Sequence, residues 1–176
     1  MPVQPLSPDE PRREIPDPGF ADDDGSTPTA VASALAAYAQ DPGNGRYQVI
    51  AALQAARVLV PVVAILGEVE YDDHGHAHEK TSDMATVLTT APDGRTGMLA
   101  FTSMQSMAAW DPQARPVATQ LQTAAASGIQ DGASALVVDL AGPRQIVIEG
   151  DELTYVAQGL RLVRVDEGWA WAQVAG

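Results

Sequence analysis

The three histidines of the chain form its most concentrated set of side chains able to do chemistry. His74, His76 and His78 alternate within residues 72–79, a stretch that also contains three carboxylates. In an extended strand alternate residues point to the same side, which places the three imidazoles roughly 6–7 Å apart along the strand. Imidazole is the commonest side-chain ligand of zinc, nickel and copper, so the segment is a candidate metal site. The alternative is a solvated loop, because nothing in a single strand containing Gly75 holds the ligands in place.

A second candidate site surrounds Lys80, the only lysine of the chain. Its ammonium group is able to bind an anionic ligand, with hydrogen bonds from Ser82 and Asp83 adding to the site. The alternative is a surface ion pair between Lys80 and Glu79 or Asp83, an interaction worth less than about 1 kcal/mol. Asp83 is also suited to a turn or a cap, because its carboxylate bonds readily to nearby backbone N–H groups. The sequence favours the surface ion pair.

The candidate partner-binding residues are the tryptophans and their neighbours. Trp110 and Asp111 precede a proline, and Arg115 follows in the same loop. Tryptophan and arginine are enriched among the residues that dominate protein–protein binding. Trp169 and Trp171 alternate, which puts both indoles on one face of a predicted C-terminal hairpin. Each tryptophan has the alternative of packing into the protein's own core.

Several common enzyme signatures are missing from the sequence. It contains no Walker A sequence, no Gly-x-Gly-x-x-Gly, no Gly-x-Ser-x-Gly and no His-Glu-x-x-His. A Ser–His–Asp arrangement would need a histidine from the acidic segment, and nothing else supports that. With no cysteine, thiolate nucleophiles, disulfides and thiolate zinc sites are excluded. We therefore expect a non-enzymatic protein without a cofactor.

Charge and hydropathy restrict the class of partner. Ten basic and 23 acidic side chains leave a formal charge of −13, which argues against binding nucleic acid or an anionic membrane surface. The first ten residues lack the basic start and apolar run of a secretory signal. The longest apolar stretch, residues 58–67, contains Pro61 and is too short to span a bilayer. These features predict a cytoplasmic protein that binds another protein or a second copy of itself.

Composition divides the chain into three parts. Residues 1–28 are acidic, contain seven of the 13 prolines and are predicted to be a disordered tail. Residues 29–158 are predicted to form the folded domain, and residues 159–176 a β-hairpin extension. In the domain, apolar spacing predicts a first helix from residue 29, a break over 41–45 and a second helix over 46–56. The β-branched run 58–66 predicts a strand in which Pro61 requires a sheet edge or a bulge.

The remaining elements interleave helices and strands. Asp93-Gly94 between two apolar runs predicts a hairpin. Residues 103–110 and 117–127 are predicted helices, the first capped by Ser103 or Thr102, and residues 135–140 and 145–149 are predicted strands. This order indicates an α+β (α/β-like) class: a single compact domain with a mixed sheet flanked by helices.

Five blocks of the sequence resemble, in order and spacing, the N-terminal domain of the SseB family, and are closest to its actinobacterial members. The blocks are RVLVPVV at 57–63, EKTSDMATVL at 79–88, DGRTGMLAFTS at 93–103, AWDPQARPV at 109–117 and GASALVVDLAGP at 132–143. The resemblance covers roughly residues 46–158. It implies a compact α/β domain of the bacterial cytoplasm, and it supplies no catalytic residues.

Together these observations predict an SseB-like domain that binds a protein partner or associates with itself. Its contact surfaces would be the edge around residues 58–66, the corner from Trp110 to Arg115 and the C-terminal hairpin. The alternative is a small-ligand or metal-binding protein that uses the histidine segment and Lys80.

Overall fold

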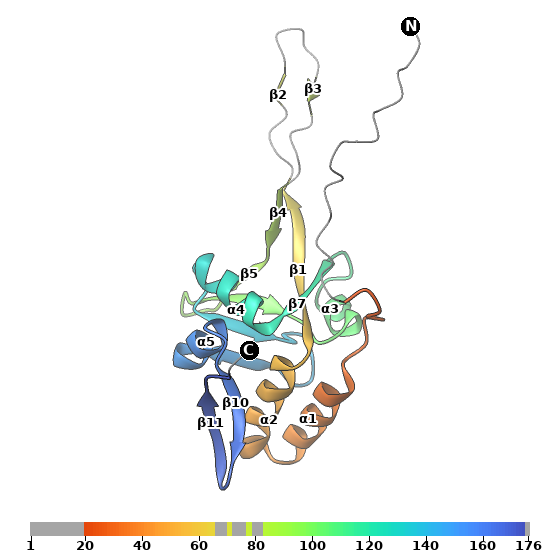
Figure 1. Ribbon diagram of the computed structural model, residues 1–176. Coiled ribbons are helices and arrows are strands. Elements are labelled where there is room, and N and C mark those ends of the chain that lie inside the picture. The colour runs from red at the N-terminus through yellow and green to blue at the C-terminus, as the bar shows by residue number, and fades with distance from the viewer. Residues whose placement is uncertain (1–19, 66–69, 72–76, 79–82, 175–176) are drawn as a thin grey trace, which may run out of the picture.

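The computed structural model describes residues 20–65, 70–71, 77–78 and 83–174. In these ranges the helices (Figure 1) are α1 Thr29–Gln40, α2 Pro42–Gln54, α3 Met104–Trp110, α4 Leu121–Gln130 and α5 Gly150–Ala157. The strands are β1 Arg57–Ile65, β2 Glu70–Tyr71, β3 Ala77–His78, β4 Asp83–Thr86, β5 Leu88–Thr90, β6 Thr96–Ala100, β7 Arg115–Gln120, β8 Ala135–Val138, β9 Ile146–Glu149, β10 Arg161–Val165 and β11 Gly168–Ala172. The class is α+β, as predicted.

Four strands form a mixed sheet in the order β5-β6-β8-β9. β6 and β8 run parallel, and the other two pairs are antiparallel. The predicted hairpin at Asp93-Gly94 is confirmed, and Gly94 has a φ of 85°, a conformation that favours glycine. Parallel strands need a long crossover, which here consists of α3, β7 and α4. The crossover brings the carboxyl ends of β6 and β8 side by side.

β1 lies between β4 and β7 in an antiparallel sheet and also contacts the end of β6. Leu59 and Phe101 exchange two backbone hydrogen bonds, each 2.8 Å long. Pro61 is opposite Pro116 of β7, whereas β4 pairs with β1 only from Val62 onward. Pro61, which has no N–H group, therefore lies where β1 has a partner strand on one side only. This agrees with the prediction that Pro61 requires a sheet edge or a bulge.

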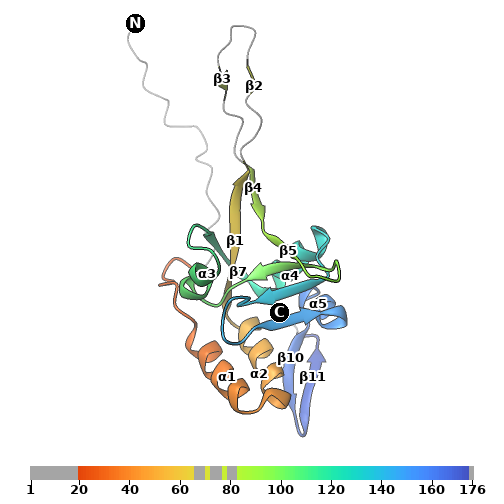
Figure 2. The same ribbon diagram turned by 180° about the vertical axis from the view of Figure 1, so that it is seen from behind.

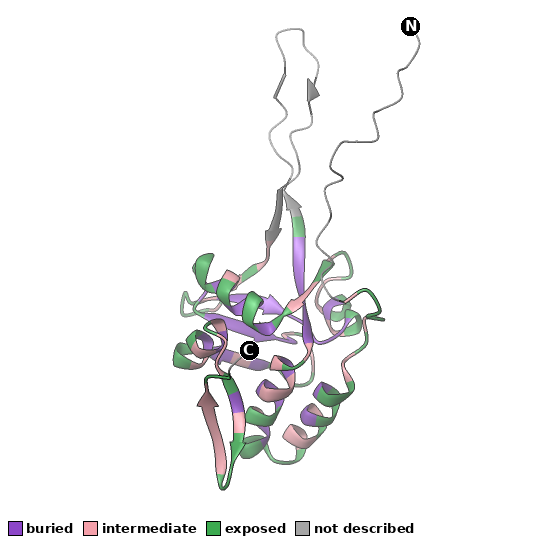
Figure 3. Ribbon diagram, in the orientation of Figure 1, coloured by how far each residue is buried: buried purple, intermediate pink, exposed green. Residues whose placement is uncertain are grey.

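The two faces of β6 fill two separate cores. Because side chains alternate along a strand, Met98 and Ala100 face a main core shared with α1, α2, α4 and α5, while Leu99 and Phe101 face a second core with Met107 of α3. These β6-segment residues are at most 1% exposed. Figures 1 and 2 show the sheet from its two sides, and in Figure 3 its buried strands lie among the helices. A strand covered on both faces explains why residues 98–101 are apolar without interruption.

The second helix begins earlier than predicted, because the presumed break is its amino-terminal cap. The Asp41 carboxylate accepts hydrogen bonds from the N–H groups of Gly43 and Asn44, at 3.2 and 3.4 Å, and Pro42 occupies the first helical position. Gly45 is buried, and a Cβ there would lie 2.5 Å from Cα of Tyr38. This glycine therefore lets α1 and α2 approach closely.

The prediction of one helix over residues 117–127 is wrong. Residues 115–120 form β7, and the helix α4 begins at Leu121. The pairing of β7 with β1 extends over six register positions, from Arg57 opposite Gln120 to Val62 opposite Arg115. Val117 and Thr119 are β-branched and suit a strand. The hydrogen-bonded pairing with β1 favours the strand over the helix for these residues.

Candidate functional site

The histidine and lysine candidates fall mostly outside the described residues. His74, His76, Lys80 and Ser82 lie there, and of His78 in β3 and Asp83 in β4 only the backbone is described. Among the residues that the structure describes, no group of three or more histidine or acidic side chains is placed to hold a metal ion. The metal and anion sites remain predictions.

Trp110 ends α3 and packs inward. Its indole is half-buried and stacks on Phe101, with ring centroids 5.6 Å apart and an interplanar angle of 29°. The Asp111 carboxylate accepts a hydrogen bond from the N–H of Gln113 at 2.9 Å, which fixes the turn after the helix. Arg115 is exposed at the start of β7. Of the three predicted residues, Trp110 therefore packs against the second core, Asp111 stabilises the turn and Arg115 is exposed.

The C-terminal hairpin of β10 and β11 also uses its tryptophans to contact the rest of the domain. Trp169 and Trp171 are half-buried and pack against the main core. The Trp171 ring lies 5.5 Å from the ring of Tyr155 on α5. The guanidinium of Arg164 lies 5.6 Å from the centroid of the Trp169 ring, a cation–π geometry. Both indoles therefore attach the hairpin to the domain.

A groove of about 170 Å³ lies between β1, β7 and α4. Its walls include Val60, Val62, Met98, Val117 and Thr123, and none of the described residues that line it is charged. Val117 is directly opposite Val60 in the register, yet it is 44% exposed whereas Val60 is 4% exposed. The sheet face that packs on the main core at β1 therefore becomes accessible to solvent at β7.

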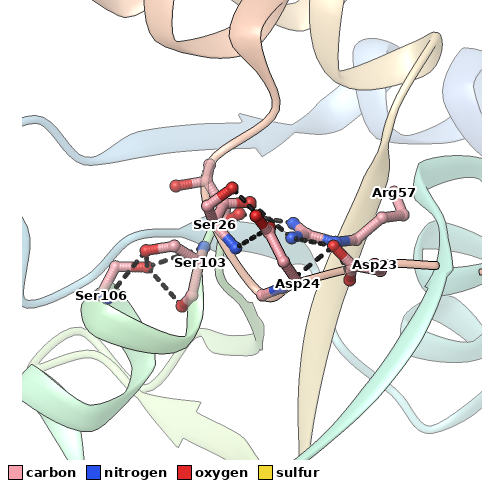
Figure 4. Close-up of polar contacts among 8 residues, drawn as sticks. Asp23, Asp24, Ser26, Arg57, Ser103 and Ser106 are labelled. Atoms are coloured by element: carbon pink, nitrogen blue, oxygen red, sulfur yellow. Dashed lines mark hydrogen bonds and ion pairs between the residues drawn. The ribbon is translucent and has the colours of Figure 1, made fainter.

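A buried arginine connects the start of β1 to the chain segment that precedes α1 (Figure 4). The Arg57 side chain is 4% exposed, and its Nε and Nη2 donate to the two carboxylate oxygens of Asp23 at 2.6 and 2.8 Å. Nη2 also donates to the carbonyl of Ser26, and Nη1 to the carbonyl of Thr102. The hydrogen bond from Arg57 lowers the pKa of Asp23 below its ordinary value. Residues 20–28, which composition assigned to an acidic tail, are thus fixed to β1.

Thr102, just after β6, is also held by Asp139, just after β8. The Asp139 carboxylate accepts from the N–H of Thr102 at 2.9 Å and from its hydroxyl at 2.7 Å. Asp139 is 6% exposed and has a φ of 55°, a backbone conformation that few residues other than glycine, asparagine and aspartate adopt. The next residue, Ser103, caps α3 as predicted: it accepts from the N–H of Ser106 at 3.0 Å.

A wider pocket of about 480 Å³ opens beside Thr102 and Asp139. It lies between α1, α3 and the loop that follows β8, and Arg144 of that loop also lines it. In sheets with parallel strands, ligands bind outside the carboxyl ends of the strands. Sequence reasoning missed Arg57, Thr102 and Asp139 as a group, although Arg57 and Asp139 could have been noticed as single charges at the ends of apolar strands.

Comparison with known families identifies the domain. The family model described as SseB protein N-terminal domain matches residues 31–154, more than half of the chain. The chain belongs to the SseB family. No curated protein and no solved structure matches it. In this SseB domain the matched range contains the groove, Arg57, Thr102 and Asp139, whereas Asp23 lies before it. In the described part, no helix is long and apolar enough to cross a membrane.

Proposed function

We propose that this SseB domain is a non-enzymatic protein-interaction module that binds its partner in the groove between β1, β7 and α4. The observation that supports the proposal is the exposure of Val117. Its side chain lies on the core face of the sheet, opposite a buried valine, and is nevertheless 44% exposed. A partner that buried it would gain roughly 25 cal/mol for each Å² of apolar surface removed from water.

The groove and the net charge together favour a particular kind of partner. The lining residues that the structure describes are uncharged, so the groove suits an apolar side chain. Thr86 in its wall donates to the exposed carboxylate of Asp131 at 2.8 Å, which places a negative charge nearby. The chain has a formal charge of −13, so two copies repel each other and a basic protein is attracted. The proposed partner presents an apolar side chain flanked by lysine or arginine.

Photo-crosslinking tests this proposal in the cells from which the sequence comes. A photoreactive phenylalanine replaces Val117 in one variant and Val165 in a control, because Val165 is 46% exposed on the distant hairpin. The expected result is a crosslink from position 117 alone, to a partner peptide with an apolar residue beside basic ones. The crosslink should disappear when Thr123 in the groove wall is changed to Arg.

Three results would contradict the proposal. One is equal labelling from positions 117 and 165, and another is a crosslink that survives Thr123→Arg. The third is a crosslink between two copies of the chain, which would show that the groove binds a second copy of the chain and not a different protein. Light scattering on a size-exclusion column distinguishes the last case directly, since a partner-binding protein is expected to elute alone as a monomer.

Metal or small-ligand binding by the histidine segment remains the second candidate. It is supported by the alternation of His74, His76 and His78 in the sequence. The same column run with EDTA, and then with zinc, tests it. An oligomer that EDTA dissociates and stoichiometric zinc restores would favour the metal site over the groove.

A further inference from the structure

Asp139 follows the carboxyl end of β8, and the backbone there does not require its negative charge. An asparagine adopts a positive φ at least as readily as an aspartate. Its amide oxygen would accept from the N–H of Thr102, and its amide N–H would donate to the Thr102 hydroxyl, so both existing bonds to the threonine would have counterparts. A turn built only for its shape would thus avoid the cost of burying a carboxylate.

Within the described residues, Asp139 has no cationic partner. Its hydrogen bonds come from the N–H and the hydroxyl of Thr102, and no ion pair includes it among the described residues. Arg57 also contacts Thr102, but its guanidinium donates to the Thr102 carbonyl and to Asp23 and not to Asp139. Asp139 as a residue is 6% exposed, and a buried carboxylate is costly unless a positive group meets it.

The pocket beside Asp139 provides room for such a group. It has a volume of about 480 Å³ and is lined by Asp139, Thr27 and Thr102, and by Arg144 at an exposed position. The hydroxyls of Thr27 and Thr102 lie 3.4 Å apart. Ala36 of α1 contributes to an apolar wall. One acidic residue, one basic residue and several residues with hydroxyl groups therefore line a single space.

We infer that this pocket binds a small amphoteric molecule, with its ammonium group toward Asp139 and its anionic group toward Arg144. Both oxygens of the carboxylate already accept from Thr102, and an ammonium group would compensate its charge through additional, charge-assisted hydrogen bonds. A guanidinium binds carboxylate and phosphate groups well, because it presents parallel donors. The location agrees with the general position of ligands at the carboxyl ends of parallel strands, here β6 and β8. The site is separate from the groove between β1, β7 and α4.

Nuclear magnetic resonance of the full, ¹⁵N-labelled chain tests the inference. The probes are glycine, β-alanine and 4-aminobutyrate, in which the separation of the two charges increases, with ethanolamine and acetate as probes of a single charge. At least one amphoteric probe is expected to shift the amide signals of Thr102 and Gly142 saturably below about 10 mM, the range of a millimolar site. Asp139→Asn should weaken this binding about tenfold or more, as expected for loss of a hydrogen bond to a charged group.

Two further variants keep the test decisive if Asp139→Asn folds poorly. Ala36→Trp places a large side chain on an exposed helical position in the pocket wall and should abolish binding, whereas Ala32→Trp, exposed on the same helix outside the pocket, should not. Arg144→Gln should weaken binding of the amphoteric probe, and Arg164→Gln on the hairpin should leave it unchanged.

The inference is overturned by any of three results. The first is the absence of saturable shifts with all three amphoteric probes. The second is equal binding by Asp139→Asn or Ala36→Trp and the unaltered chain. The third is binding of ethanolamine or acetate as tight as that of the best amphoteric probe, because a single charge would then be sufficient.

Discussion

Two arginine networks in this domain have almost the same geometry and very different surroundings. Arg57 pairs with Asp23 at 2.6 Å, and Arg95 pairs with Asp93 at 2.7 Å and with Glu149 at 2.6 Å. The Arg57 side chain is 4% exposed, whereas that of Arg95 is 58% exposed. Water solvates Arg95 whether or not its partners are present, but it cannot replace the partners of Arg57. The comparison teaches that burial, and not the N···O distance, decides what an ion pair contributes.

The sharpest test of this difference is the removal of each guanidinium. Arg57→Met should destabilise the domain by about 3–5 kcal/mol, the usual cost of breaking a buried pair, because the carbonyls of Ser26 and Thr102 lose their donor. Urea denaturation measures the loss. A midpoint equal to that of the unaltered chain would show that the Arg57 network contributes as little as an exposed one.

A smaller loss is expected when the carboxylate of the buried network is removed. Asp23→Asn should cost about 2 kcal/mol, since Arg57 keeps its bonds to the carbonyls of Ser26 and Thr102. The effect should be local as well. The N–H of Met104 donates to the carbonyl of Gly25 at 2.8 Å, so its hydrogen exchange should accelerate if Asp23 fixes this segment. Unchanged hydrogen exchange at Met104 would show that the ion pair of Asp23 does not hold this segment in place.

The pH dependence of stability gives a third, more selective comparison. Hydrogen bonding to Arg57 lowers the pKa of Asp23 below 3.8. A lowered pKa stabilises the fold fully above the ordinary value, and this stabilisation is lost as the pH falls from there through the lowered value. The difference in unfolding free energy between the unaltered chain and Asp23→Asn should therefore be constant near neutral pH and shrink below about pH 4. A difference that persists to the lowest pH would contradict this.

The smallest effect is expected at the exposed network. Arg95→Gln should leave the urea midpoint unchanged within error, because the side chains of Arg95, Asp93 and Glu149 are all about half exposed or more. Salt provides the matching control. Raising the ionic strength should weaken the remaining exposed interactions and spare the Arg57 network, since buried pairs are screened much less. A large loss on Arg95→Gln would remove the distinction between the two networks.

The candidate sites differ in how far sequence could predict them. The tryptophans Trp110, Trp169 and Trp171 are visible in the sequence, but their spacing is the same whether they meet a partner or the core. Only the stacking of Trp110 on Phe101 and the packing of Trp171 against Tyr155 show that these two indoles already have neighbours within the chain. The pocket was not predictable, because Thr27, Thr102 and Asp139 come from three distant segments.

What the sequence determined by itself was local. The hairpin at Asp93-Gly94, the cap at Ser103 and the apolar run that predicted β1 depend on spacings of a few residues and on backbone preferences, which act wherever the chain goes. The tertiary structure alone decided that residues 115–120 form a strand, since that required β1 beside them. It also brought together pairs 34 and 37 residues apart, Asp23 with Arg57 and Thr102 with Asp139. Such contacts depend on strand order and direction, which no local pattern specifies.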